Sequence, residues 1–131
     1  RRQRQMCIRD SNYEILKKYL FVREKLRPYM RKTMDECSAV GAPVMRPLWY
    51  EFPGDPEAWE TEDEYTLGAS LLVAPVTDAG AAERSVYLPA GTVWKDCSTG
   101  TVYKGGQRVT VPAPIDVIPV FVRGNEDIEV Y

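Results

Sequence analysis

Apolar side chains recur every three or four positions between residues 12 and 39. This spacing predicts a long amphipathic helix, because residues three and four apart share one helical face. Pro28 predicts either a kink or the start of a second helix, and Gly41 marks the expected end. We interpret the apolar row as core packing rather than as the wall of a ligand groove. Its members are Ile15, Leu16, Tyr19, Leu20, Val22, Leu26, Tyr29, Met30, Met34 and Cys37.

A short apolar run follows over residues 43–52 and lacks strict alternation. Such a run predicts a strand buried on both faces, as in a parallel sheet. Pro47 fits this strand only near its end, since proline cannot donate to a ladder. Arg46 lies inside the run, and a buried guanidinium needs a carboxylate or carbonyl partner. We favour a structural tie between Arg46 and a neighbouring loop over contact with a ligand.

The next segment carries two helix-start signals. Asp55 followed by Pro56 predicts an N-cap and a first helical position. Thr61 and Glu64 have the spacing of a capping box, which predicts a second short helix ending at Gly68. Acidic residues crowd here, but they lack the order of a calcium loop, and acids favour helix N-termini. We therefore expect structural roles for Glu51, Asp55, Glu57, Glu60, Glu62, Asp63 and Glu64.

The most apolar segment, Leu67 to Val76, separates two kinds of sequence. After it, short runs bounded by Gly, Pro, Asp and Ser predict a small antiparallel β-sandwich. The expected strands are 84–88, 92–95, 101–103, 108–111 and 117–122, and Gly105-Gly106 is expected to form a hairpin turn. We divide the chain into an arginine-rich, non-native tail (1–11), a mixed α/β part (12–76) and an all-β part (77–131) that is incomplete at its end.

Charge and composition limit the binding partners and the kinds of catalytic site that the chain could have. The chain of 131 residues has a net charge of −2, which gives no reason to expect a nucleic acid partner or an anionic membrane. The absence of histidine excludes Ser-His-Asp and Cys-His catalytic units within this chain. Cys7, Cys37 and Cys97 have neither disulfide-framework nor metal-site spacing, so we expect no metal or cofactor. Free thiols favour a reducing compartment, and therefore a cytoplasmic location.

A series of ordered motifs resembles glycoside hydrolase family 31, the α-glucosidase and α-xylosidase family. The resemblance covers residues 13–125 and depends on the order and spacing of the motifs. They are Leu26–Tyr29, Gly41–Leu48, Glu62–Val76, Arg84–Gly91, Trp94–Asp96, Tyr103–Gly106 and Pro119–Arg123.

The resemblance implies a fold class, an α+β fragment. Residues 12–67 would be the last helix and last strand of a (β/α)8 barrel, followed by a short helix, and residues 77–125 a small antiparallel β-sandwich. The sandwich would pack under the barrel end and stabilise it.

It also implies a chemistry. The family hydrolyses α-glycosidic bonds with retention, using one aspartate as nucleophile and another as acid. Both would lie upstream, so we assign no catalytic, cofactor-binding or metal-binding residue and expect the fragment alone to be inactive.

The whole protein would act on oligosaccharides with terminal α-linked xylose or glucose. The stretches Gly54–Trp59 and Ile118–Arg123 favour an α-xylosidase over an α-glucosidase. Assembly of the whole protein into a homo-oligomer is left open as a possibility.

Two features compete with this interpretation. Trp94-Lys95-Asp96-Cys97 resembles the family's nucleophile motif, but we expect Asp96 to be a turn residue that binds nearby backbone. A non-catalytic carbohydrate-binding or structural module, or a stand-alone adaptor domain, is the alternative function. A binding module would expose coplanar aromatic side chains, whereas a structural sandwich would bury them. The candidate aromatics are Trp49, Trp59, Trp94, Tyr50, Tyr87 and Tyr103.

Overall fold

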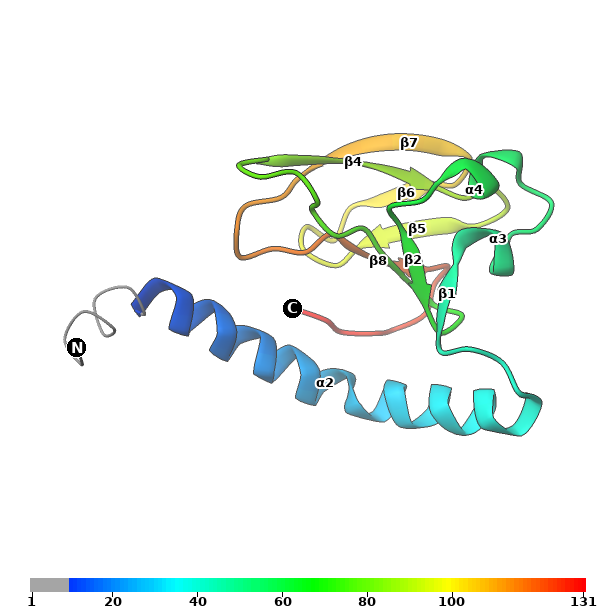
Figure 1. Cartoon of the computed structure of the whole chain (residues 1–131), viewed down its shortest axis with the longest axis horizontal. Helices are drawn as coiled ribbons and strands as arrows, with labels where there is room; N and C mark the ends of the chain where they lie inside the picture. Colours follow the sequence, from blue (N-terminus) through cyan, green and yellow to red (C-terminus); the bar gives the residue numbers. More distant parts are fainter. Residues whose placement is uncertain (1–9) are drawn as a thin grey trace.

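The computed structural model describes residues 10–131 (Figure 1). A long helix, α2 (Asp10–Val40), runs along one side of a body of short strands. The predicted tail lies outside the described residues except for Asp10 and Ser11, which begin α2. Within residues 10–131 no helix is both long and apolar enough to cross a membrane.

The predicted helix is confirmed as a single element of 31 residues. Pro28 lies inside it, so the alternative of a second helix starting there is wrong. Gly41 follows with a φ of +71°, a left-handed conformation that suits glycine at a helix end. Most of α2 is open to solvent, and its buried side chains are Thr33 and Cys37.

Six strands form one antiparallel sheet in the order β1-β2-β3-β8-β5-β6. Their bounds are β1 Met45–Pro47, β2 Tyr65–Leu67, β3 Leu71–Val73, β5 Val93–Asp96, β6 Val102–Lys104 and β8 Val120–Arg123. A second sheet pairs β4 (Glu83–Leu88) with β7 (Gln107–Pro112). Strand β8 is the last in sequence and lies between β3 and β5.

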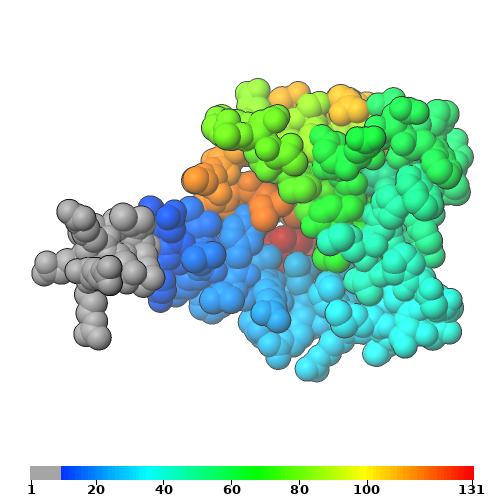
Figure 2. Space-filling model, in the orientation of Figure 1, coloured from blue at the N-terminus to red at the C-terminus, as the bar shows by residue number. Residues whose placement is uncertain are grey.

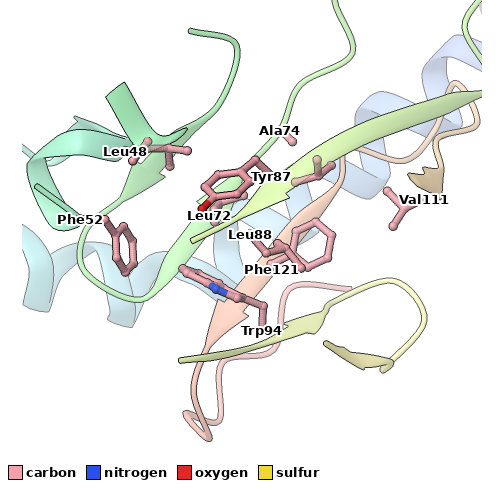
Figure 3. Close-up of a cluster of buried hydrophobic side chains, with 11 residues drawn as sticks. Leu48, Phe52, Leu72, Ala74, Tyr87, Leu88, Trp94, Val111 and Phe121 are labelled. Carbon is pink, nitrogen blue, oxygen red and sulfur yellow. The ribbon is translucent and has the colours of Figure 1, made fainter. Parts of the chain in front are cut away.

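The apolar strand β3 is covered on both faces because its side chains alternate between two clusters. Leu72 packs with Phe121 and Trp94 between the two sheets (Figure 3). Leu71 and Val73 belong instead to a cluster that receives side chains from α2. The α2 members are Val22, Leu26 and Tyr29.

Residues 43–52 do not form the expected strand of a parallel sheet. β1 has three residues, pairs antiparallel with β2, and leaves Met45 60% exposed. Pro47 then precedes a short helix, α3 (Leu48–Glu51). The strand ends there because proline has no amide hydrogen for a further ladder bond.

Two further predictions are wrong. Thr61 to Gly68 holds no helix: residues 65–67 are β2, where pairing with both β1 and β3 outweighs the capping-box signal. Gly105-Gly106 joins no hairpin, because β6 and β7 lie in different sheets. The turn instead packs closely: a Cβ at Gly105 would overlap the Pro89 carbonyl oxygen.

The predictions for the Asp55 cap and for the strands after Val76 are confirmed. Asp55 caps α4 (Pro56–Glu60), with Pro56 at its first position, as predicted. The five strands expected after Val76 are all present, with shifted ends. The six-stranded sheet draws strands from both sides of residue 76, so the two parts share one sheet. The division at residue 76 and the barrel-end assignment stay predictions.

Candidate functional site

Glu51 lies at the centre of a charged cluster that joins three parts of the chain. Arg46, at β1, forms an ion pair with it, and Arg123, at the end of β8, forms another at 3.3 Å. Arg46 also donates to the Pro43 carbonyl at 2.7 Å and contacts Cys37 Sγ at 3.2 Å. Burial opposes the charge of Arg46, but Glu51 and Cys37 raise its pKa above the ordinary value. The prediction that Arg46 is a structural tie is confirmed.

Asp55 connects α4 to the second sheet. Its Oδ1 accepts from the Glu57 amide at 3.1 Å, while Oδ2 accepts from the Tyr87 hydroxyl at 2.6 Å and the Ala90 amide at 3.3 Å. Burial would raise the pKa of Asp55, but these hydrogen bonds hold it below the usual value. Burial, followed by the bond to Asp55, raises the pKa of Tyr87.

Asp63 and Glu64 lie side by side in sequence but in different environments. Asp63 forms an ion pair with Arg84 at 3.0 Å. Glu64 is 4% exposed; its Oε1 accepts from the Tyr87 amide at 2.7 Å, and its Oε2 has no hydrogen-bond partner among the described residues. Burial raises the pKa of Glu64 to about 7.

Glu51, Asp55 and Asp63 each form hydrogen bonds or ion pairs within the fold. No group of three or more His, Cys, Asp or Glu within residues 10–131 is placed to hold a metal ion. Cys37 and Cys97 are free, and Cys7 lies outside the described residues. Asp96 is 2% exposed and accepts from the Ser98 amide and hydroxyl, both at 2.8 Å. Its predicted role as a turn residue is confirmed.

The six candidate aromatics do not form one platform. Trp94 and Tyr87 are core residues, and Trp94 Nε1 donates to the Pro89 carbonyl at 3.0 Å. Trp49 and Trp59 are 40% and 55% exposed and stack on each other, with centroids 5.1 Å apart and an interplanar angle of 13°. Together they make a small exposed aromatic surface, the Trp49–Trp59 pair.

The outer side of α2 also exposes apolar side chains. Tyr13, Leu16 and Leu20 are 58%, 66% and 62% exposed, and their spacing places them on one helical face. We call these three residues the outer ridge; the helix that carries them forms one flank of the molecule in Figure 2. The helical period predicted an apolar row that includes Leu16 and Leu20, but it did not predict that the sheet would leave these two uncovered or that Tyr13 would lie beside them.

The family follows from comparison with known proteins. The family model for the glycosyl hydrolase family 31 C-terminal domain matches residues 41–128. The chain belongs to glycoside hydrolase family 31. Neutral α-glucosidase C of Mus musculus is 42% identical over 118 residues, which are 89% of this chain and 13% of that protein. Alpha-glucosidase 2 of Bacillus thermoamyloliquefaciens is 35% identical over 123 residues, 94% of this chain and 16% of that protein.

A solved structure agrees with the fold of this family 31 chain. It is a GH31 α-xylosidase from a soil metagenome, complexed with xylose, with 46% identity and a TM-score of 0.88. The match covers 91% of this chain and 18% of the α-xylosidase chain. The chain thus spans less than a fifth of the length of these glycosidases, and its residues 41–128 correspond to the family's C-terminal domain.

Proposed function

We propose that this chain is the C-terminal part of a retaining α-glycosidase that removes terminal α-linked xylose or glucose from oligosaccharides. The observation that carries the proposal is the similarity to α-glucosidases and an α-xylosidase over 89–94% of the chain. Retaining hydrolysis needs two carboxyl groups flanking one glycosidic bond. In residues 10–131, the carboxylates of Glu51, Asp55 and Asp96 are instead engaged in ion pairs and hydrogen bonds within the fold. We place the two catalytic aspartates upstream and propose that the fragment alone is inactive.

The role of this chain in the enzyme would be structural. The outer ridge supports the idea that α2 is the last helix of a barrel whose remaining units cover Tyr13, Leu16 and Leu20. Such coverage would contribute on the order of 1 kcal/mol for each leucine, at about 25 cal/mol per Å² removed from water. The sheets would then pack beneath the barrel and hold its end in place.

Recovery of the upstream coding sequence tests the enzymatic proposal. We expect an open reading frame that runs into Tyr13 and encodes the two aspartates. The full-length protein should hydrolyse aryl α-xylosides faster than aryl α-glucosides, because the α-xylosidase is 46% identical to this chain. The opposite preference would make it an α-glucosidase. A reading frame without an upstream barrel would refute both.

The docking role can be tested separately in the full-length protein. Leu16→Gln with Leu20→Gln should lower the thermal unfolding midpoint by several degrees, because polar groups would enter a buried contact. Lys17→Gln changes an exposed residue between them and serves as the control. Equal midpoints for the two variants would show that the outer ridge stays in solvent.

The Trp49–Trp59 pair favours carbohydrate binding as a second candidate function. Trp59 Nε1 donates to the Pro53 carbonyl at 2.9 Å, so its ring is held in place with 55% of its surface exposed. Affinity electrophoresis in gels containing α-glucan or xyloglucan tests this function. Retardation that is lost in Trp59→Ala but kept in Val102→Ala, another exposed apolar position, would support it. Equal mobility with and without polysaccharide would rule it out.

A further inference from the structure

Glu64 occupies an unusual position at the edge of the second sheet. β4 pairs with β7 on one side only, so its other edge carries backbone groups that need partners. One of these, the Tyr87 amide, donates to Glu64 Oε1 at 2.7 Å. The Glu64 carboxyl group therefore accepts a hydrogen bond that a neighbouring strand would otherwise accept, and it connects the segment before β2 to β4.

The second carboxyl oxygen has no compensating charge beside it. Arg84, on β4, donates to the carbonyls of Pro75 at 3.0 Å and Asp63 at 2.8 Å, and pairs with the Asp63 carboxylate. Arg108, on β7, pairs with Glu57 at 2.9 Å. Both arginines act on Glu64 at longer range, against the repulsion from Asp63.

The remaining neighbours do not supply a donor either, because Glu64 Oε2 accepts no hydrogen bond from the Tyr65 or Thr77 hydroxyl or from any other described residue. An open cavity of about 430 Å³ lies beside Glu64 and is lined by residues that include Met45, Arg46, Glu62 and Tyr65. Arg46 is paired with Glu51, and Glu62 is a further acid. An ionised Glu64 would thus hold a buried charge with one backbone donor and an unpaired oxygen.

We propose that Glu64 is a protonation-controlled latch that holds the segment before β2 on the free edge of β4 when neutral and favours release of that segment into solvent when ionised, because the buried charge would have one backbone donor and an unpaired oxygen. The neutral acid keeps one oxygen for the Tyr87 amide and needs no buried counter-charge. The inference concerns this chain's own fold and does not depend on the proposed glycosidase activity.

The direction of the pH effect follows from linkage. Burial raises the pKa of Glu64 from 4.5 in the unfolded chain to about 7 in the folded one. The stabilising contribution is therefore complete below pH 4.5 and lost as the pH rises through about 7. The change in stability therefore falls between pH 4.5 and about 7, so the latch would close as the pH drops below neutral.

Hydrogen exchange in the full-length protein tests the latch locally. The exchange rate of a peptide spanning β4 is measured in the wild type and in Glu64→Gln at each pH. The wild-type rate divided by the Gln rate should rise about tenfold or more between about pH 5.5 and about pH 8. Glu62→Gln, which alters the exposed neighbouring acid, is the control. Its exchange rate divided by the Glu64→Gln rate should rise with pH as much as the wild-type ratio does.

Two results would overturn the proposal. The first is a rate ratio that does not change with pH, which would mean that Glu64 does not titrate in this range. The second is a rate ratio that falls as the pH rises, which would mean that the ionised Glu64 holds the segment before β2 better than the neutral acid does. Glu64→Met gives a second non-titrating reference if Glu64→Gln fails to fold.

Discussion

Replacing Gly68 with alanine should test how α2 is seated on the sheet. Gly68 lies in the turn between β2 and β3 with a φ of +68°. A Cβ there would overlap the Tyr29 hydroxyl and approach Thr33 Cγ2 to 2.9 Å, and both residues lie on α2. The Tyr29 hydroxyl also donates to the Leu67 carbonyl at 2.6 Å and accepts from the Ser70 amide at 3.3 Å. The added methyl group would therefore disturb the contact through which α2 packs on the turn between β2 and β3.

The expected cost has two parts. The left-handed backbone costs alanine about 1 kcal/mol more than glycine. Overpacking and disturbance of the Tyr29 hydrogen bonds add about 2 kcal/mol. The free energy of unfolding should fall by about 3 kcal/mol in total, which is a large part of a domain's net stability.

Gly100→Ala separates the two parts. Gly100 has a similar φ of +76°, but no atom lies within 4 Å of its would-be Cβ. It should therefore lose about 1 kcal/mol, the backbone cost alone. Urea unfolding followed by tryptophan fluorescence measures both variants.

The double variant Gly68→Ala with Tyr29→Phe removes the overlapped hydroxyl and should cost less than the two single changes added together. Equal losses for Gly68→Ala and Gly100→Ala would refute the claim that α2 is locked at this turn.

Three further changes address other contacts. Glu51→Gln should lower the free energy of unfolding, measured in urea, by about 3 kcal/mol, because Arg46 loses its buried partner. Glu129→Gln, at an exposed ion pair, should change it by less than about 0.5 kcal/mol. Asp55→Ala should cost about 2 kcal/mol at neutral pH, from a lost N-cap and a lost Tyr87 hydrogen bond. Because the pKa of Asp55 is lowered on folding, that difference should shrink as the pH falls below 3.8, and a constant difference would contradict the assignment. Burial raises the pKa of Cys97 to about 12, so iodoacetamide should label it far more slowly in the folded chain than in urea, as measured by mass spectrometry.

Much of the local structure could be predicted because its causes are close in sequence. The helical period of residues 12–39 gave a helix with nearly the observed ends, and Asp55-Pro56 gave a cap. Polar turn residues separated the later strands correctly. Asp96 could be predicted as a turn residue because an aspartate before a turn binds nearby backbone, and its partner in the structure, Ser98, lies two positions away.

The wrong predictions concern elements whose structure depends on segments far away in the sequence. Residues 61–64 carry a capping pattern, yet β2 exists because β1 and β3 flank it. No local signal places β8 between β3 and β5, or β6 and β7 in separate sheets. The burial of Glu64 and the uncovered side of α2 likewise depend on which elements meet in three dimensions.

The position of β8 has a consequence for synthesis. A ribosome releases β1, β2, β3, β5 and β6 before it releases β8, so the growing chain holds a three-stranded piece and a two-stranded piece with no strand to join them. During that interval Leu72 and Trp94 lack Phe121, and two strand edges are open to pairing with other chains. A transcript that stops before Val120 would leave these edges open permanently. Completion of β8 therefore joins the two pieces into one sheet and closes both edges.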